Sequence, residues 1–192
     1  MTLEGKLKQR EQAFESVFFS RLNAERIEKL HQARERKEAR QALARATGIS
    51  ETQVLDEILD LGVDPQTLKA LSLVPLVCVA WADGELDDKE RAAALEAAEA
   101  EGVCRDSGSY QLFEAWLARP PGVAGGPLLQ AWKDYTVALL GFLGDEAREA
   151  LGRDMLERAR EVARATGGLL GLGRRISDEE QAVLDELEAV FG

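Results

Sequence analysis

The stretch AWADGELDDKE, which ends the most apolar run of the chain, has the residue types that hold a divalent cation. Its acidic residues are Asp83, Glu85, Asp87, Asp88 and Glu90. Carboxylate oxygens are the ligands that Ca²⁺ and Mg²⁺ prefer, and the spacing Asp83-x-Glu85-x-Asp87 imitates the first ligands of an EF-hand loop. That loop, however, needs glycine at its sixth position and glutamate at its twelfth, whereas Gly84 is second and Ala94 is twelfth. The stretch is therefore either a cation site of another kind or a helix start whose acids only cap it.

A second stretch near the end of the chain, RRISDEE, repeats the same pattern. In both places an aliphatic residue precedes a capping residue, two spacers and a glutamate: Leu86-Asp87-x-x-Glu90 and Ile176-Ser177-x-x-Glu180. This is the capping box, in which the cap oxygen accepts from the third helical amide and the glutamate accepts from the amide of the cap. We expect Leu86 and Ile176 to lie side by side, which would bring the two acidic helix starts together.

The residues expected to form one acidic site are Asp83, Glu85, Asp87, Glu90, Glu179 and Glu180. Their expected role is to bind a divalent cation, with Ca²⁺ or Mg²⁺ as the candidates, or a basic protein partner. No cofactor is assigned.

Other chemistry has little support in the sequence, so we expect no enzyme. His31 is the only histidine and lies in a highly charged segment, which leaves a Ser/His/Asp arrangement without a suitable base. Cys78 and Cys104 form no CxxC pair, so a structural zinc site is not expected. The glycine-rich segment 167–175 matches neither of the common nucleotide-binding loop patterns and is interpreted as a connector.

Composition favours an all-α fold. Apolar residues make up 45% of the 192 residues, enough for a core, and alanine, leucine, glutamate and arginine, all good helix formers, dominate. Periodic apolar stripes and caps predict a single bundle of about eight helices with no strand. The run Leu71–Ala82 is too short to span a bilayer and should form the central buried helix, with a fresh start near Pro75. Ser50 and Ser109 are expected to start two of the other helices.

The charge is unevenly distributed along the chain. Residues 1–50 hold 11 Lys and Arg against 7 Asp and Glu, a balance of +4, and residues 51–192 hold 13 against 28, a balance of −15. We therefore expect a basic helical arm over residues 1–47 and an acidic domain over 48–192. The acidic body disfavours nucleic-acid binding, while the arm suits an acidic partner or the surface of an anionic membrane.

The arm itself is expected to be helical over residues 6–46, with a new helix starting after Asn23. Phe14, Val17, Phe18 and Leu22 form an apolar stripe on its first part. Such a stripe suits docking on the body or self-association. The first residues contain no apolar signal segment, and the two separate cysteines fit a reducing compartment, so a cytoplasmic location is expected.

The two acidic motifs resemble those of the TerB-like family, the helical domains associated with tellurite resistance and stress. The residues that carry the resemblance are Asp83, Gly84, Leu86 and Glu90 in the first motif and Ile176, Ser177 and Glu180 in the second. It covers roughly residues 67–192 and leaves the arm without a counterpart. The resemblance implies an all-helical, non-catalytic module in a stress response, with acidic positions proposed to bind metal. The alternative is an assembly protein whose arm self-associates and whose acids only cap helices.

Overall fold

The computed structural model describes residues 3–119, 126–166 and 176–192, without the side chains of residues 3–20, 165 and 166. Within these ranges all regular structure is helical: eight α-helices, one 3-10 helix and no strand. The prediction of an all-α fold with about eight helices is confirmed. By their contacts, the residues form two compact units, residues 1–41 and residues 42–192.

The first helix, α1 (Leu3–Thr47), runs through the first unit without interruption. The expected new start after Asn23 is therefore wrong. Asparagine in a helix interior costs only a few tenths of a kcal/mol relative to its neighbours, and the surrounding Ala, Glu, Arg and Leu residues are strong helix formers. Every described side chain from residue 21 to residue 38 is exposed. The last turn of α1 belongs to the second unit, where Leu43 is fully buried, whereas the predicted domain boundary follows the end of the helix at residue 47.

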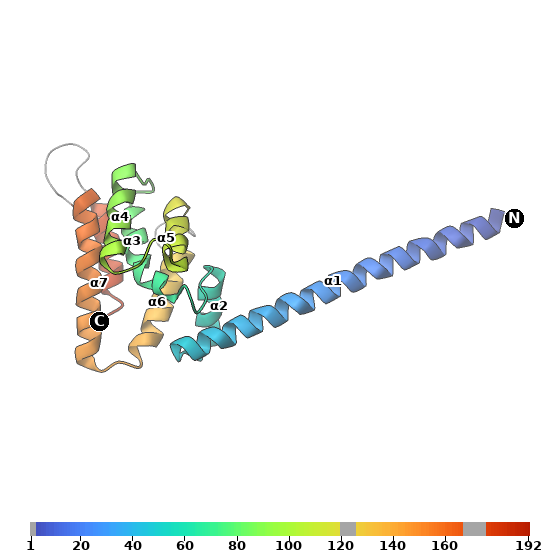
Figure 1. The fold of residues 1–192 in the computed structure, drawn as a ribbon, viewed down its shortest axis with the longest axis horizontal. Helices are drawn as coiled ribbons and strands as arrows, with labels where there is room; N and C mark the ends of the chain where they lie inside the picture. The colour runs from blue at the N-terminus through green and yellow to red at the C-terminus, as the bar shows by residue number, and fades with distance from the viewer. Residues whose placement is uncertain (1–2, 120–125, 167–175) are drawn as a thin grey trace. The chain divides into compact units, whose positions relative to one another are not determined.

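The second unit is a helical bundle. Its helices are α2 (Thr52–Asp60), the 3-10 helix η1 (Leu68–Leu73), α3 (Val74–Ala80), α4 (Asp88–Ala100), α5 (Gly108–Ala118), α6 (Pro127–Leu140), α7 (Asp145–Thr166) and α8 (Asp178–Glu188). All seven residues of α3 are buried, and α3 contacts α4, α5, α6, α7 and α8. It is the central helix of the bundle in Figure 1, as the apolar run Leu71–Ala82 predicts. Pro75 lies in its first turn, where proline leaves no helical hydrogen bond unmade.

Two expected helix starts lie elsewhere in the structure. The N-cap of α2 is Glu51 rather than Ser50, and its side chain makes no capping hydrogen bond. Helix α5 begins after Ser107, whose Oγ accepts from the amide of Tyr110 at 3.2 Å. Ser109 lies inside α5 and is only 3% exposed. In both places a neighbouring polar residue takes the N-cap position: Glu51 follows Ser50, and Ser107 precedes Ser109 by two residues.

Helix α8 is held against the bundle by an apolar face and by ion pairs. Val183, Leu184 and Leu187 are buried in the core. Lys133 of α6 pairs with Glu186 at 2.7 Å, and Arg160 of α7 pairs with Glu188 at 3.1 Å. Exposed pairs of this kind contribute little to stability, so the apolar face carries most of the attachment. The packing places α8 beside the central helix α3.

Candidate functional site

The first acidic motif forms the predicted helix start. Asp87 is the N-cap of α4, and its Oδ1 accepts from the amides of Lys89 at 2.7 Å and of Glu90 at 2.8 Å. The amide of Asp87 donates in return to Glu90 Oε2 at 2.9 Å. Before the helix, Asp83 Oδ1 accepts from the amide of Glu85 at 3.0 Å, and Gly84 takes a positive φ of 87°. These hydrogen bonds hold the acidic stretch in one defined turn that leads into the helix.

The second motif forms the same structure at the start of α8. Ser177 Oγ accepts from the amide of Glu180 at 3.1 Å, and the amide of Ser177 donates to Glu180 Oε2 at 2.6 Å. Glu180 is only 8% exposed, whereas Glu90 is half-buried. Both predicted capping boxes are therefore present, and the second lies deeper in the protein.

The two motifs lie close enough to affect each other. Burial raises the pKa of Glu90, and the negative charges of Asp87, Asp83 and Glu180 raise it further, while the hydrogen bond from the Asp87 amide lowers it. The contribution of Glu180 comes from the other motif and supports the expected convergence of the two helix starts. Leu86 and Ile176, which precede the starts of α4 and α8, both pack against the same hydrophobic core.

The six expected site residues fall into two groups. Asp87, Glu90 and Glu180 are half-buried or buried, and each accepts a hydrogen bond from a backbone amide at its own helix start. Asp83, Glu85 and Glu179 are exposed to solvent. A ligand or partner approaching from solvent would therefore meet the exposed group first.

The described residues contain no group of three or more His, Cys, Asp or Glu side chains placed to hold a metal ion. The carboxylate oxygens of Asp87, Glu90 and Glu180 accept hydrogen bonds from backbone amides. These bonds occupy lone pairs that a cation would need. The assignment of these residues as ligands of Ca²⁺ or Mg²⁺ stays a prediction.

The remaining candidates of the sequence are in unremarkable environments. His31 is exposed on α1. Cys78 is buried in α3, and burial raises the pKa of its thiol to about 12, so it stays protonated at neutral pH. Trp116 and Trp132 are core residues, 3% and 1% exposed. The glycine-rich segment 167–175 lies outside the described residues, and among the described helices none is long and apolar enough to cross a membrane.

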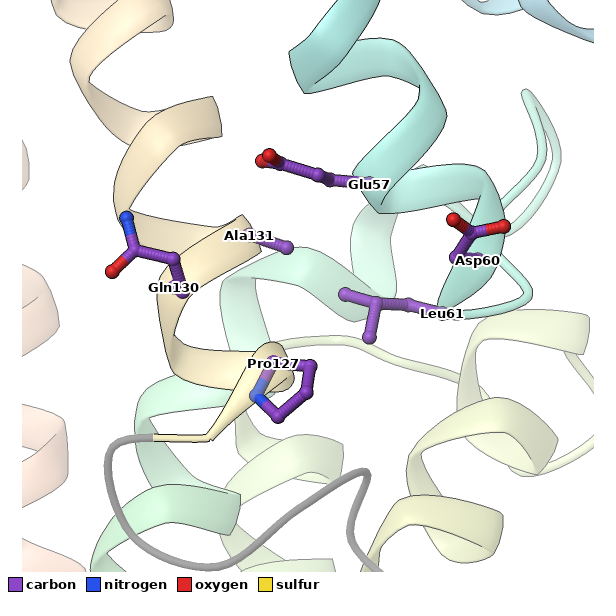
Figure 2. Close-up of a pocket in the computed structure, with 6 residues that line it drawn as sticks. All are labelled: Glu57, Asp60, Leu61, Pro127, Gln130 and Ala131. Carbon is purple, nitrogen blue, oxygen red and sulfur yellow. The ribbon is translucent and has the colours of Figure 1, made fainter.

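The structure also shows a cavity that sequence reasoning missed. It lies between α2 and α6, has a volume of about 310 Å³, and is drawn in Figure 2. The residues that line it are Glu57, Asp60, Leu61, Pro127, Gln130 and Ala131. The two helices are far apart in the chain, so no local spacing in the sequence indicates that these residues meet. The one signal available in the sequence was the pair of acids, Glu57 and Asp60, at the end of α2.

Comparison with protein-family models finds no match for this chain, and no curated protein or solved structure shows significant similarity to it. The resemblance to the TerB-like family therefore depends on the two acidic motifs alone.

Proposed function

We propose that this protein is a non-enzymatic, TerB-like helical module of a stress response that presents an acidic surface to a basic protein partner. The acidic surface consists of Asp83, Glu85, Asp87, Glu90, Glu179 and Glu180. Two observations support the proposal: Leu86 and Ile176 pack against the same core, and Glu180 is among the charges that raise the pKa of Glu90. From them we infer that two acidic helix starts far apart in the chain share one region.

The charges of the bundle favour a basic partner over a bound cation. Residues 51–192 carry a balance of −15, which attracts a basic partner at long range and speeds its association. The exposed carboxylates of Asp83, Glu85 and Glu179 are accessible to lysine and arginine side chains without rearrangement. A divalent ion, by contrast, would require at least three oxygens to turn inward, and several of those oxygens accept hydrogen bonds from the backbone.

Binding of an octalysine peptide to the full chain tests this proposal. The double variant Asp83→Asn/Glu179→Gln removes one exposed charge from each motif. Because exposed charge pairs contribute up to about 1 kcal/mol each, we expect its affinity to fall several-fold and its dependence on salt to weaken. The matched control, Asp106→Asn/Glu149→Gln, removes two exposed charges elsewhere on the bundle. Equal losses of affinity in both variants would show attraction by net charge alone and would contradict a defined surface.

The melting temperature in Ca²⁺, Mg²⁺ or Mn²⁺ tests the cation as the alternative ligand. A cation that binds only the folded state stabilises it by about 2.7 kcal/mol at 100 times its dissociation constant. A rise in the melting temperature that disappears in Asp83→Ala would assign the surface to a cation. An unchanged melting temperature, or an equal rise in both proteins, would leave the basic partner as the ligand.

The exposed apolar residues of α1 favour a second candidate function, assembly through the arm. Leu22, Ile27 and Leu30 are 40%, 55% and 70% exposed, which is unusual for large apolar side chains on one helix segment. A second copy of the chain would cover them. Sedimentation velocity of the full chain should then show a dimer or larger species that the variant Ile27→Gln/Leu30→Gln reduces to a monomer. A monomer in both proteins would contradict assembly through residues 6–46.

A further inference from the structure

Among the side chains that the structure describes, the exposed large apolar ones lie in only two segments. Leu22, Ile27 and Leu30 are on α1. The other two are Val137, in the last turn of α6, and Phe142, two residues after that helix, and they are 58% and 63% exposed. Single exposed apolar residues scattered over a surface are ordinary, but here they are confined to two short segments. Each segment is therefore a candidate for contact with another molecule.

The α6 end, defined as residues 137–143, presents its apolar side chains on a well-defined turn. The amide of Gly141 donates to the carbonyl of Val137 at 3.2 Å, and the amide of Phe142 donates to the carbonyl of Leu139 at 3.0 Å. Arg148 Nε donates to the carbonyl of the last residue of α6 at 2.8 Å. Three further apolar residues of the α6 end are half-buried: Ala138, Leu139 and Leu143. The Phe142 side chain is therefore exposed on a hydrogen-bonded backbone beside other apolar groups.

The charges near the α6 end favour a basic partner. Residues 134–150 hold one base against four acids, a balance of −3. Asp145 and Glu146, which begin α7, are exposed, and the one base, Arg148, pairs with Asp145 at 3.7 Å. Negative charge repels the surface of an anionic membrane and attracts a helix whose apolar residues are flanked by lysine and arginine.

The exposed segment of α1 has this composition. Residues 21–41 hold 7 Lys and Arg against 4 Asp and Glu, a balance of +3. Ile27 and Leu30 are three residues apart and so are neighbours on the helix surface, and the adjacent Arg26 and Lys29 are exposed. Pairing of two arms with each other would bring like net charges together, whereas pairing with the α6 end brings opposite charges together.

We propose that the α6 end of one copy of this chain binds residues 26–30 of α1 in a second copy. The contact covers Ile27 and Leu30 on one side and Val137 and Phe142 on the other. Two copies related by a two-fold axis make the contact twice, which closes the assembly as a dimer. This inference rests on the assembly function proposed for the arm and names the surface that receives it. It uses no residue of the acidic surface.

Sedimentation velocity over a range of protein concentrations tests the contact from both sides. Ile27→Gln/Leu30→Gln alters the arm, and Val137→Gln/Phe142→Gln alters the α6 end. Because each variant loses the burial of large apolar side chains, we expect the dissociation constant of the dimer to rise at least about tenfold in both. Wild-type association in the α6-end variant would overturn this inference and leave assembly through the arm intact. A wild-type chain that is monomeric at every concentration would contradict both.

Mixing the two variants is the more specific test. The α6-end variant keeps a functional arm, and the arm variant keeps a functional α6 end, so one contact can form between them. We expect a heterodimer at least about tenfold tighter than the self-association of either variant. A fluorescent maleimide on Cys104, which is exposed while Cys78 is buried, identifies the labelled variant in the sedimentation profile.

The control for the mixture is the variant that carries all four substitutions. It has neither half of the contact, so its mixture with the α6-end variant should stay monomeric. Formation of a heterodimer in the first mixture would also show that both variants fold. Arm-to-arm pairing predicts no heterodimer, and its absence would overturn the proposal.

Charge variants test why the two segments attract. Asp145→Asn/Glu146→Gln should raise the dissociation constant of the dimer several-fold, and added salt should weaken the wild-type dimer. The matched control, Glu96→Gln/Asp106→Asn, removes two exposed acids outside residues 134–150 and should change the constant by less than about twofold. Equal effects of the two charge variants, or association unchanged by salt, would contradict the charge complementarity that assigns a second copy to the α6 end.

Discussion

Acidic side chains gather at two places in the bundle, and their hydrogen bonding differs completely. At the starts of α4 and α8, Glu90 Oε2 and Glu180 Oε2 each accept from the amide of their N-cap residue, at 2.9 Å and 2.6 Å. At the end of α2, Glu57 Oε2 is buried without a hydrogen-bond partner. The residue type is the same in both places, but the acids lie at opposite ends of their helices.

The helix backbone explains this difference. The first turn of a helix presents free amides and a partial positive charge, which satisfy carboxylates, whereas the last turn presents carbonyls and a partial negative charge. Acids at a helix start therefore stabilise the fold through their hydrogen bonds to backbone amides. Only their exposed carboxylate oxygens are left to bind a partner. An acid at a helix end has no such amides and costs stability. The comparison teaches that the end of the helix, rather than the number of acids, decides whether a carboxylate finds a backbone donor.

Truncation of the buried capping glutamate should have the largest effect. Glu180→Ala removes a side chain that is 8% exposed and leaves the amide of Ser177 without its acceptor. We expect a loss of about 2 kcal/mol in the free energy of unfolding, from the partly buried amide left unpaired together with the lost cap. Glu90→Ala, at the more exposed start, should lose about 1 kcal/mol. Urea unfolding measures both, and a larger loss for Glu90 would contradict the assigned burial.

Removal of the N-cap side chain should lower the stability of the protein more at α4 than at α2. Asp87 accepts from two amides, so Asp87→Ala should cost about 1 kcal/mol. Glu51, the N-cap of α2, makes no capping hydrogen bond, and Glu51→Ala should change stability by less than about 0.5 kcal/mol. Thermal or urea unfolding of the two variants gives the comparison. Equal losses would show that the hydrogen bonds of Asp87 contribute nothing specific.

Charge removal at opposite helix ends should have opposite signs. Glu57→Gln removes a negative charge from the last turn of α2 and should stabilise the protein by about 0.5 kcal/mol. Asp88→Asn removes one from the first turn of α4 and should destabilise it by a similar amount, about 0.5 kcal/mol. Unfolding in low salt is the appropriate measurement, because salt screens these interactions. The same sign in both variants would refute the helix-end explanation.

The smallest expected effect is a dependence on pH at Glu90. Its folded-state pKa is raised above the ordinary value of 4.5, first by burial and then by Asp87, Asp83 and Glu180. The stability gained from the protonated form is therefore fully present below pH 4.5 and is lost as the pH rises through the folded-state pKa. Glu90→Gln stays neutral at every pH and keeps an acceptor for the Asp87 amide.

The stability of Glu90→Gln relative to the wild type should consequently increase from pH 4.5 toward neutrality. The increase should be a few tenths of a kcal/mol, because water screens a half-exposed group. Urea unfolding across this pH range measures it. In Glu180→Ala, which removes one of the neighbouring charges, substitution of Glu90 by Gln should give a smaller increase. A difference that does not vary with pH would contradict the raised pKa of Glu90, and an equal increase in the Glu180→Ala background would contradict the proximity of the two motifs.

Much of the fold follows from local patterns in the sequence. Asp87 and Ser177 cap the predicted helices because their side chains accept from amides only a few residues away. The apolar run around Cys78 likewise predicts the buried helix from residues that are adjacent in the chain. The helix starts at Ser50 and Ser109 were wrong because other polar residues, Glu51 and Ser107, lie within one or two positions and are the N-caps instead. Residue type alone does not distinguish such close alternatives.

The sequence by itself determined the helices, their two acidic capping boxes and the uneven charge of the chain, since all of these depend on residues within one or two turns of each other. Only the tertiary structure decided that Glu180 acts on Glu90 and that Glu57 lies opposite Ala131 in a cavity. Helices α2, α4, α6 and α8 are brought together by burial of apolar surface, which is non-directional and leaves no local spacing in the sequence. Whether a carboxylate has a hydrogen-bond partner therefore depends on tertiary packing. Residues that are neighbours along the chain do not show that packing.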